Sequence, residues 1–180
     1  VNEGQVLQSW SLGAQARFSE RPIASNDVVV PYDFPAGQQR TLLIRYAPHF
    51  GKLVMGPELW SSDEFLAFEH ARSNALSLFY GLSVMMAAVV LLLYFALKDR
   101  AYLYHLGIVI SGLLAYMSAD GNIARYFLPE SPDLAWKLNV SSIVIILPAQ
   151  LQFARLLLGT KQRMPRLDRF TAHYALVCLA

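Results

Sequence analysis

The side chains of this sequence that could carry chemistry are few and widely spaced. The four histidines, His49, His70, His105 and His173, form no pair at a metal-ligand spacing. The single cysteine, Cys178, has no partner for a disulfide within the chain. The sequence shows no Ser-His-Asp order, glycine-rich phosphate loop, carboxylate pair or HExxH motif. We therefore expect no catalytic site, metal site or cofactor in this chain.

Three side chains in the first third of the chain are of the types that hold a sugar. Trp10 and Trp60 can stack on a sugar ring, and Arg45 can offer forked hydrogen bonds to its hydroxyls. Structural roles compete with this one, because Trp60 also suits a core or interface anchor and Arg45 a solvated strand face. The sequence leaves ligand binding and structural roles open for these three residues.

A second group of polar residues falls at or within predicted membrane depth: Asp120, Asn122, Asn139, Gln150 and Gln152. Hydrogen bonding between helices is the ordinary use of such residues, and a substrate path is the alternative. His105, one turn into the second apolar segment, is expected to be a packed or interfacial residue.

Long apolar segments are predicted to form the membrane helices that position these residues. Residues 76–97 contain no charged side chain, and about 22 helical residues span ~33 Å, enough for a ~30 Å hydrocarbon core. Further apolar segments cover residues 102–119 and 134–158, and a fourth begins near Phe170. Lys137 and Arg155 in the third lie near its ends, where long side chains reach the interface. Pro148 is expected to kink that helix.

The basic residues alternate between loops and predict orientation. The positive residues concentrate in the first and third loops: Lys98, Arg100, Lys161, Arg163, Arg166 and Arg169. Because such residues stay on the cytoplasmic side, residues 1–74 and 120–133 are predicted to be outside. Anionic-lipid contact is a second role for the cluster at 161–169.

A stripe of small residues follows the second segment at every fourth position: Gly107, Ser111, Ala115 and Ala119. Small side chains allow a second helix to approach closely, so we interpret the stripe as a packing seam. A sliding surface used in signalling is the alternative.

The first third of the chain shows short strand-like segments separated by turn residues. Four strands are predicted, at residues 6–10, 27–34, 40–47 and 52–60. Residues 61–75 then read as a helix capped by Ser61 or Ser62 and continuous with the membrane segment. The predicted fold is a mixed membrane protein. It has a partial antiparallel β-sandwich (1–60), a connector (61–75) and a truncated transmembrane bundle (76–180).

The ends of the chain and its net charge indicate whether the protein is complete and which partners to expect. The chain begins at Val1 and stops at Ala180 inside an apolar run, so we expect a fragment of a longer protein. A formal charge of +2 is too small to indicate a nucleic-acid partner. The lipid bilayer is the expected partner, and homodimer formation stays open.

Several phrases in order resemble one family, the bacterial seven-transmembrane receptors with diverse intracellular signalling modules. ARFSERPI and the stretch from VVVPYDF to PELWSSDEF resemble the end of that family's type 2 extracellular domain. SLFYG, the Lys-Asp-Arg turn, Tyr-x-Tyr, Gly-Asn and FARLLLGTKQRMPRLDR resemble the first part of its membrane domain.

This resemblance implies a sensor in the bacterial inner membrane with a periplasmic N-terminal domain. The outer domain would be a jelly-roll-like β-sandwich that binds a carbohydrate or another small molecule. About three and a half of seven helices would lie in this chain. A cytoplasmic diguanylate cyclase or histidine kinase would follow. A transporter or membrane-embedded enzyme with an accessory outer domain is the alternative, and a structural module is a third possibility.

Overall fold

Helices make up all of the regular structure that the computed structural model describes, which covers residues 8–13, 16–37, 41–45 and 56–177. A short 3-10 helix, η1, precedes the long helices, and a π-helical turn, η2, joins the second long helix to the third. The elements are η1 (Phe18–Glu20), α1 (Ser62–Leu97), α2 (Arg100–Ala119), η2 (Ile123–Phe127), α3 (Pro132–Leu158), α4 (Thr160–Arg163) and α5 (Pro165–Val177).

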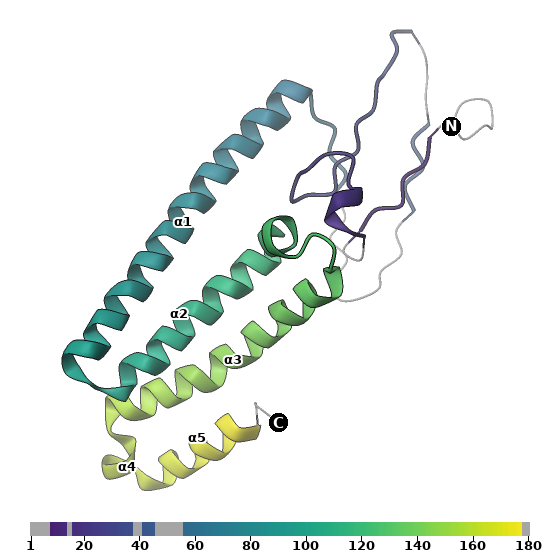
Figure 1. The fold of residues 1–180 in the computed structure, drawn as a ribbon. Coiled ribbons are helices and arrows are strands. Elements are labelled where there is room, and N and C mark those ends of the chain that lie inside the picture. Colours follow the sequence, from purple (N-terminus) through teal and green to yellow (C-terminus); the bar gives the residue numbers. More distant parts are fainter. Residues whose placement is uncertain (1–7, 14–15, 38–40, 46–55, 178–180) are drawn as a thin grey trace.

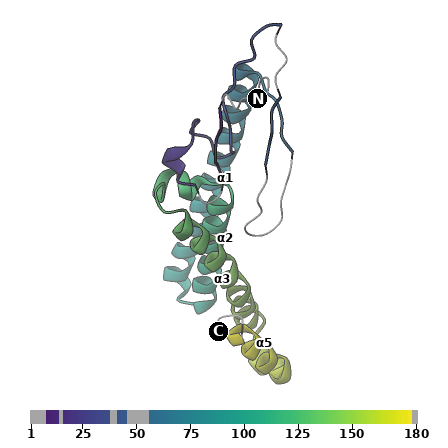
Figure 2. The same ribbon diagram turned by 90° about the vertical axis from the view of Figure 1, so that its right-hand side faces the viewer.

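The long helices pack in chain order as antiparallel neighbours. Figure 1 shows α2 between α1 and α3, with α5 returning along the far end of α3. The α1–α2 turn is tight, because Lys98 ends α1 in the left-handed region at φ 51° and the Asp99 side chain accepts from the Ala101 N–H at 2.9 Å. Both views place the described part of residues 8–60 at one end of the helices and α4 and α5 at the other (Figure 2).

Three helices, α1, α2 and α3, are long and apolar enough to cross a membrane. Large apolar side chains cover much of their outer surface, including Leu78, Val84 and Leu92 of α1. α1 has 36 residues and runs without a break from its N-cap, where the Ser61 hydroxyl accepts from the Glu64 N–H at 3.3 Å. The connector predicted over residues 61–75 is therefore the start of the same helix that enters the membrane segment.

The α2–α3 interface is the most extensive in the described structure. Ser111 of the small-residue stripe is buried in α2, the His105 and Phe153 rings lie 4.9 Å apart, and the Asn139 amide donates to the Ala115 carbonyl at 3.0 Å. A Cβ added at Gly107 would meet no atom within 4 Å, so this end of the stripe is not in close helix contact here. α3 continues through Pro148, which is buried.

The Asn139 contact gives a stability prediction. Asn139→Leu should lower the free energy of unfolding of the membrane helices by about 1 kcal/mol, because the Ala115 carbonyl loses an interhelical donor. Unfolding in mixed detergent micelles measures it. Ser141→Leu, on an exposed position of the same helix, is the control. Equal stability of the two variants would contradict the assignment.

The predicted β-sandwich is wrong for the described residues. No strand occurs at the described positions of the four predicted segments, which are 8–10, 27–34, 41–45 and 56–60; the remaining positions of those segments lie outside the description. Leu42 and Leu43, which would face opposite sides of a strand, are 66% and 82% exposed. Alternating side chains favour extended backbone, but a sheet also needs a paired neighbour and a buried face. Pro31 further removes a ladder donor from the segment 27–34.

Candidate functional site

Arg72 on α1 joins the N-terminal segment, which is the described part of residues 8–60, to the end of α2. Its guanidinium pairs with Asp27 of the N-terminal segment and, at 2.8 Å, with Asp120 at the C-cap of α2. The Asp120 side chain is only 13% exposed and that of Arg72 27%, so this pair is largely shielded from water. The Arg72 side chain therefore links the N-terminal segment and the end of α2 to α1, although the three are distant in sequence.

Amide and hydroxyl groups extend the contacts around Asp120. The Asn122 amide donates at 2.9 Å to both the Tyr80 hydroxyl and the Asp120 carboxylate, and the Asn26 amide donates to the Asn122 carbonyl oxygen at 2.9 Å. Asn122 is buried. We call the set Asn26, Asp27, Arg72, Tyr80, Asp120 and Asn122 the outer network. Its members come from the N-terminal segment, α1 and the α2–η2 turn.

The turn after α2 brings its backbone close to the N-terminal segment. Gly121 has φ +83°, a conformation that side chains rarely adopt, and a Cβ there would lie 3.5 Å from Asn26. Beyond it, η2 closes a wider turn in which the Leu128 N–H donates to the Ile123 carbonyl at 2.9 Å. Such wide turns often occur at functional sites.

Further contacts fix residues 16–27 on the same end of the bundle. The Phe18 N–H donates to the Pro129 carbonyl at 2.9 Å, and Arg17 pairs with Glu130 at 3.6 Å. The Arg21 guanidinium donates to the Ser25 and Asn26 carbonyls at 3.0 Å and holds the turn that presents Asn26. The N-terminal segment is therefore docked on the membrane helices.

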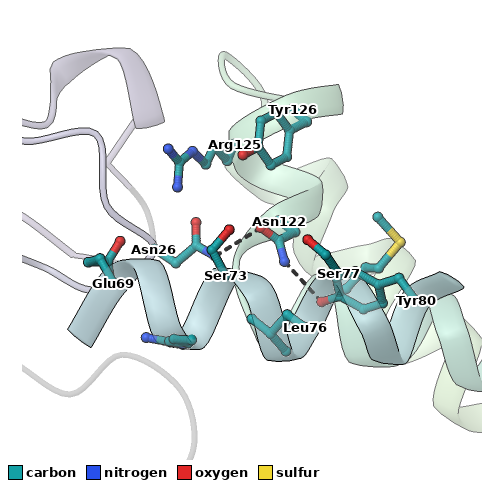
Figure 3. Close-up of a pocket in the computed structure, with 11 residues that line it drawn as sticks. Asn26, Glu69, Ser73, Leu76, Ser77, Tyr80, Asn122, Arg125 and Tyr126 are labelled. Carbon is teal, nitrogen blue, oxygen red and sulfur yellow. Dashed lines mark hydrogen bonds between the residues drawn. The ribbon is translucent and has the colours of Figure 1, made fainter. Parts of the chain in front are cut away.

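A pocket of about 140 Å³ opens beside the outer network, between the N-terminal segment, α1 and η2 (Figure 3). Charged, amide and hydroxyl side chains line much of it: Asn26, Glu69, Arg72, Ser73, Ser77, Tyr80, Asn122 and Arg125. No cluster of metal-binding side chains occurs in the described part of the chain. The lining therefore combines hydrogen-bonding groups with the apolar side chains of Leu76 and Met117.

The opposite end of the bundle has its own ion pair. Arg155 of α3 donates from two nitrogens to Asp168 of α5, at 2.9 and 2.8 Å, and the buried Thr160 hydroxyl donates to the same carboxylate at 2.7 Å. These bonds, from Arg155 first and then Thr160, lower the pKa of Asp168 from 3.8 to about 2. Gln152 accepts from Arg155 at 2.9 Å. The contacts fasten α5 to α3.

The three predicted ligand residues lie away from this pocket. Trp60 packs its ring 5.2 Å from Phe68 and donates to Glu58 at 2.9 Å, whereas Arg45 is exposed and Trp10 half-buried. None of the three lines the pocket. Their role in ligand binding stays a prediction.

The six predicted topology residues are exposed at the end of the helices opposite the outer network: Lys98, Arg100, Lys161, Arg163, Arg166 and Arg169. Of the polar residues at membrane depth, Asp120 and Asn122 belong to the outer network, and Asn139 and Gln152 make the contacts described above. Four members of the outer network were not predicted as site residues from the sequence: Asn26, Asp27, Arg72 and Tyr80. An arginine one turn before an apolar segment was the available signal, but its partners lie 45 and 48 positions away.

Comparison with protein families agrees with this arrangement. Residues 73–180 match the family described as 7TM diverse intracellular signalling, and residues 1–61 match the 7TMR-DISM extracellular 2 domain. No curated protein and no solved structure matches the chain. The first match covers more than half of the chain and the second covers the residues before the membrane helices. The chain therefore belongs to the 7TM diverse intracellular signalling family of membrane receptors, with an extracellular sensing part and intracellular signalling.

Proposed function

We propose that this receptor transmits the state of its extracellular residues to the membrane helices through the outer network. The signal is a carbohydrate or another small molecule, and the output is a diguanylate cyclase or histidine kinase on the cytoplasmic side of a bacterial inner membrane. The observation that supports the coupling is Arg72, which contacts Asp27 of the extracellular part and Asp120 of α2 at once.

The geometry of α1 and α2 explains how the outer network can pass a displacement to the membrane helices. α1 is one continuous helix, so a shift at Arg72 moves the membrane part of the same rod. Asp120 caps α2, so the same shift acts on the α1–α2 pair. A receptor of this kind needs two arrangements of its helices that bind the signal differently, and the network can form in one and break in the other.

The proposal also includes the orientation of the chain in the membrane. We assign Lys98, Arg100, Lys161, Arg163, Arg166 and Arg169 the role of holding their loops on the cytoplasmic side. The match of residues 1–61 to an extracellular domain supports this, because the described part of those residues lies at the other end of the helices.

Two insertions into α1 of the full-length receptor test whether the signal passes through the outer network. Two alanines after Asn74 should abolish the response to signal, because two helical residues rotate Arg72 by about 200° relative to Tyr80 and Asp120. Output is measured as cyclic dinucleotide formed or as phosphorylation, according to the module present. Two alanines after Asp63 form the control, since they leave Arg72 in register with Asp120. An unchanged response in the Asn74 insertion would refute the route.

A further inference from the structure

The pocket beside the outer network contains an acidic and a basic side chain that do not pair with each other. Glu69 of α1 and Arg125 of η2 both line it, yet they form no ion pair within 4.0 Å. Figure 3 shows Arg125 extending from η2 toward the region of Asn26 and Glu69. Arg72 is the other basic side chain in the lining, and its charge is already matched by Asp27 and Asp120.

Two oxygen atoms in the same lining are buried and lack a hydrogen-bond donor. They are Glu69 Oε1 and Asn26 Oδ1. The Asn26 amide nitrogen is already used on Asn122, which fixes the orientation of that side chain. Arg125, for its part, makes no ion pair among the described residues and places its guanidinium 5.2 Å from the Tyr126 ring centre. Buried acceptors are rarely left without donors in folded proteins, and the half-buried Arg125 is free to pair with an anion.

We propose that this pocket binds a small zwitterion that carries an ammonium and a carboxylate group. The ammonium donates to Glu69 and Asn26 Oδ1, and the carboxylate accepts from Arg125, with the hydroxyl of Ser73 beside them. Each unmatched group of the pocket then has a partner of the opposite kind. A neutral sugar would leave both charges unmatched.

The volume of the pocket indicates how much of a ligand it can enclose. About 140 Å³ corresponds to the volume of roughly five water molecules, so the smallest amino acids would fit inside the pocket. A bound zwitterion would contact the N-terminal segment, α1 and η2 together, next to the outer network. Its effect on signalling rests on the proposed function, whereas its binding does not.

Calorimetric titration of the purified full-length receptor in nanodiscs tests the proposal. The probes are glycine, β-alanine and γ-aminobutyrate, which separate the two charges by one, two and three carbon atoms. Acetate, methylamine and glucose each lack one or both charges. At least one zwitterion should bind about tenfold or more tightly than acetate or methylamine, since each charged hydrogen bond contributes to affinity.

Substitutions inside and outside the pocket test whether the zwitterion binds there. Glu69→Gln and Arg125→Gln should each weaken zwitterion binding about tenfold or more, while Asp63→Asn and Arg163→Gln, both exposed and outside the pocket, should leave it unchanged. The proposal is overturned if no zwitterion binds, if acetate binds as well as the zwitterions, or if both pocket variants bind normally. Binding without any change of output would instead count against the proposed function alone.

Discussion

Arg72→Leu in the full-length receptor should abolish the response to signal and lower the free energy of unfolding of the outer end of the bundle by about 2–3 kcal/mol. The substitution keeps most of the side-chain volume but leaves the shielded Asp120 carboxylate without its cation. Removing one partner of a largely buried pair is costly because the other charge stays desolvated. The loss of the Asp27 contact also frees the N-terminal segment from α1.

Two measurements and two control variants separate the effects of Arg72→Leu. Output of the intracellular module reports coupling, and amide hydrogen exchange in residues 16–27 reports docking. Arg72→Lys keeps the charge but contacts both carboxylates less well, so it should fall between wild type and Arg72→Leu. Arg17→Ala removes the exposed pair with Glu130 and should change stability by less than about 1 kcal/mol. A normal response from Arg72→Leu would rule out the outer network as the route.

The sequence was sufficient for the membrane helices because their signal is local. An apolar run without charges predicts a spanning helix from composition alone, and Lys98–Arg100 can only be a tight turn between two such runs. The structure accordingly contains α1, α2 and α3 at nearly the predicted positions. The continuity of α1 through residues 61–75 also follows from a local feature, which is the lack of glycine or proline after the Ser61 cap.

The extracellular part and the site depend on partners that are distant in sequence. Alternation in residues such as Thr41–Arg45 predicts extended backbone, but whether strands pair depends on neighbours that the pattern does not specify. Arg72 shows that the site, too, depends on partners that the local sequence does not specify. Its type and position signal an interfacial arginine, whereas its two carboxylate partners are chosen by the docking of the N-terminal segment and by the α2–η2 turn.

Asp168→Asn should release α5 from α3 and produce the second large effect. The neutral amide cannot match the Arg155 guanidinium, whose side chain is only 20% exposed, and Thr160 loses its charged acceptor. Hydrogen exchange of the α5 amides in the full-length receptor in nanodiscs should accelerate about tenfold or more, while exchange in α1 stays unchanged. Asp63→Asn, at the start of α1, is the charge-matched control.

The charge of Asp168 also predicts how α5 docking depends on pH and on its partner. Because the pKa of Asp168 is lowered from 3.8 to about 2, the stabilisation is complete above pH 4 and is lost as the pH falls toward 2. Protection of α5, corrected for intrinsic exchange, should therefore be constant between pH 5 and 8. Arg155→Met in the Asp168→Asn background should restore much of the protection, because no unpaired charge remains at the contact. If the double variant exchanges as fast as Asp168→Asn alone, the ion pair does not determine how α5 is held.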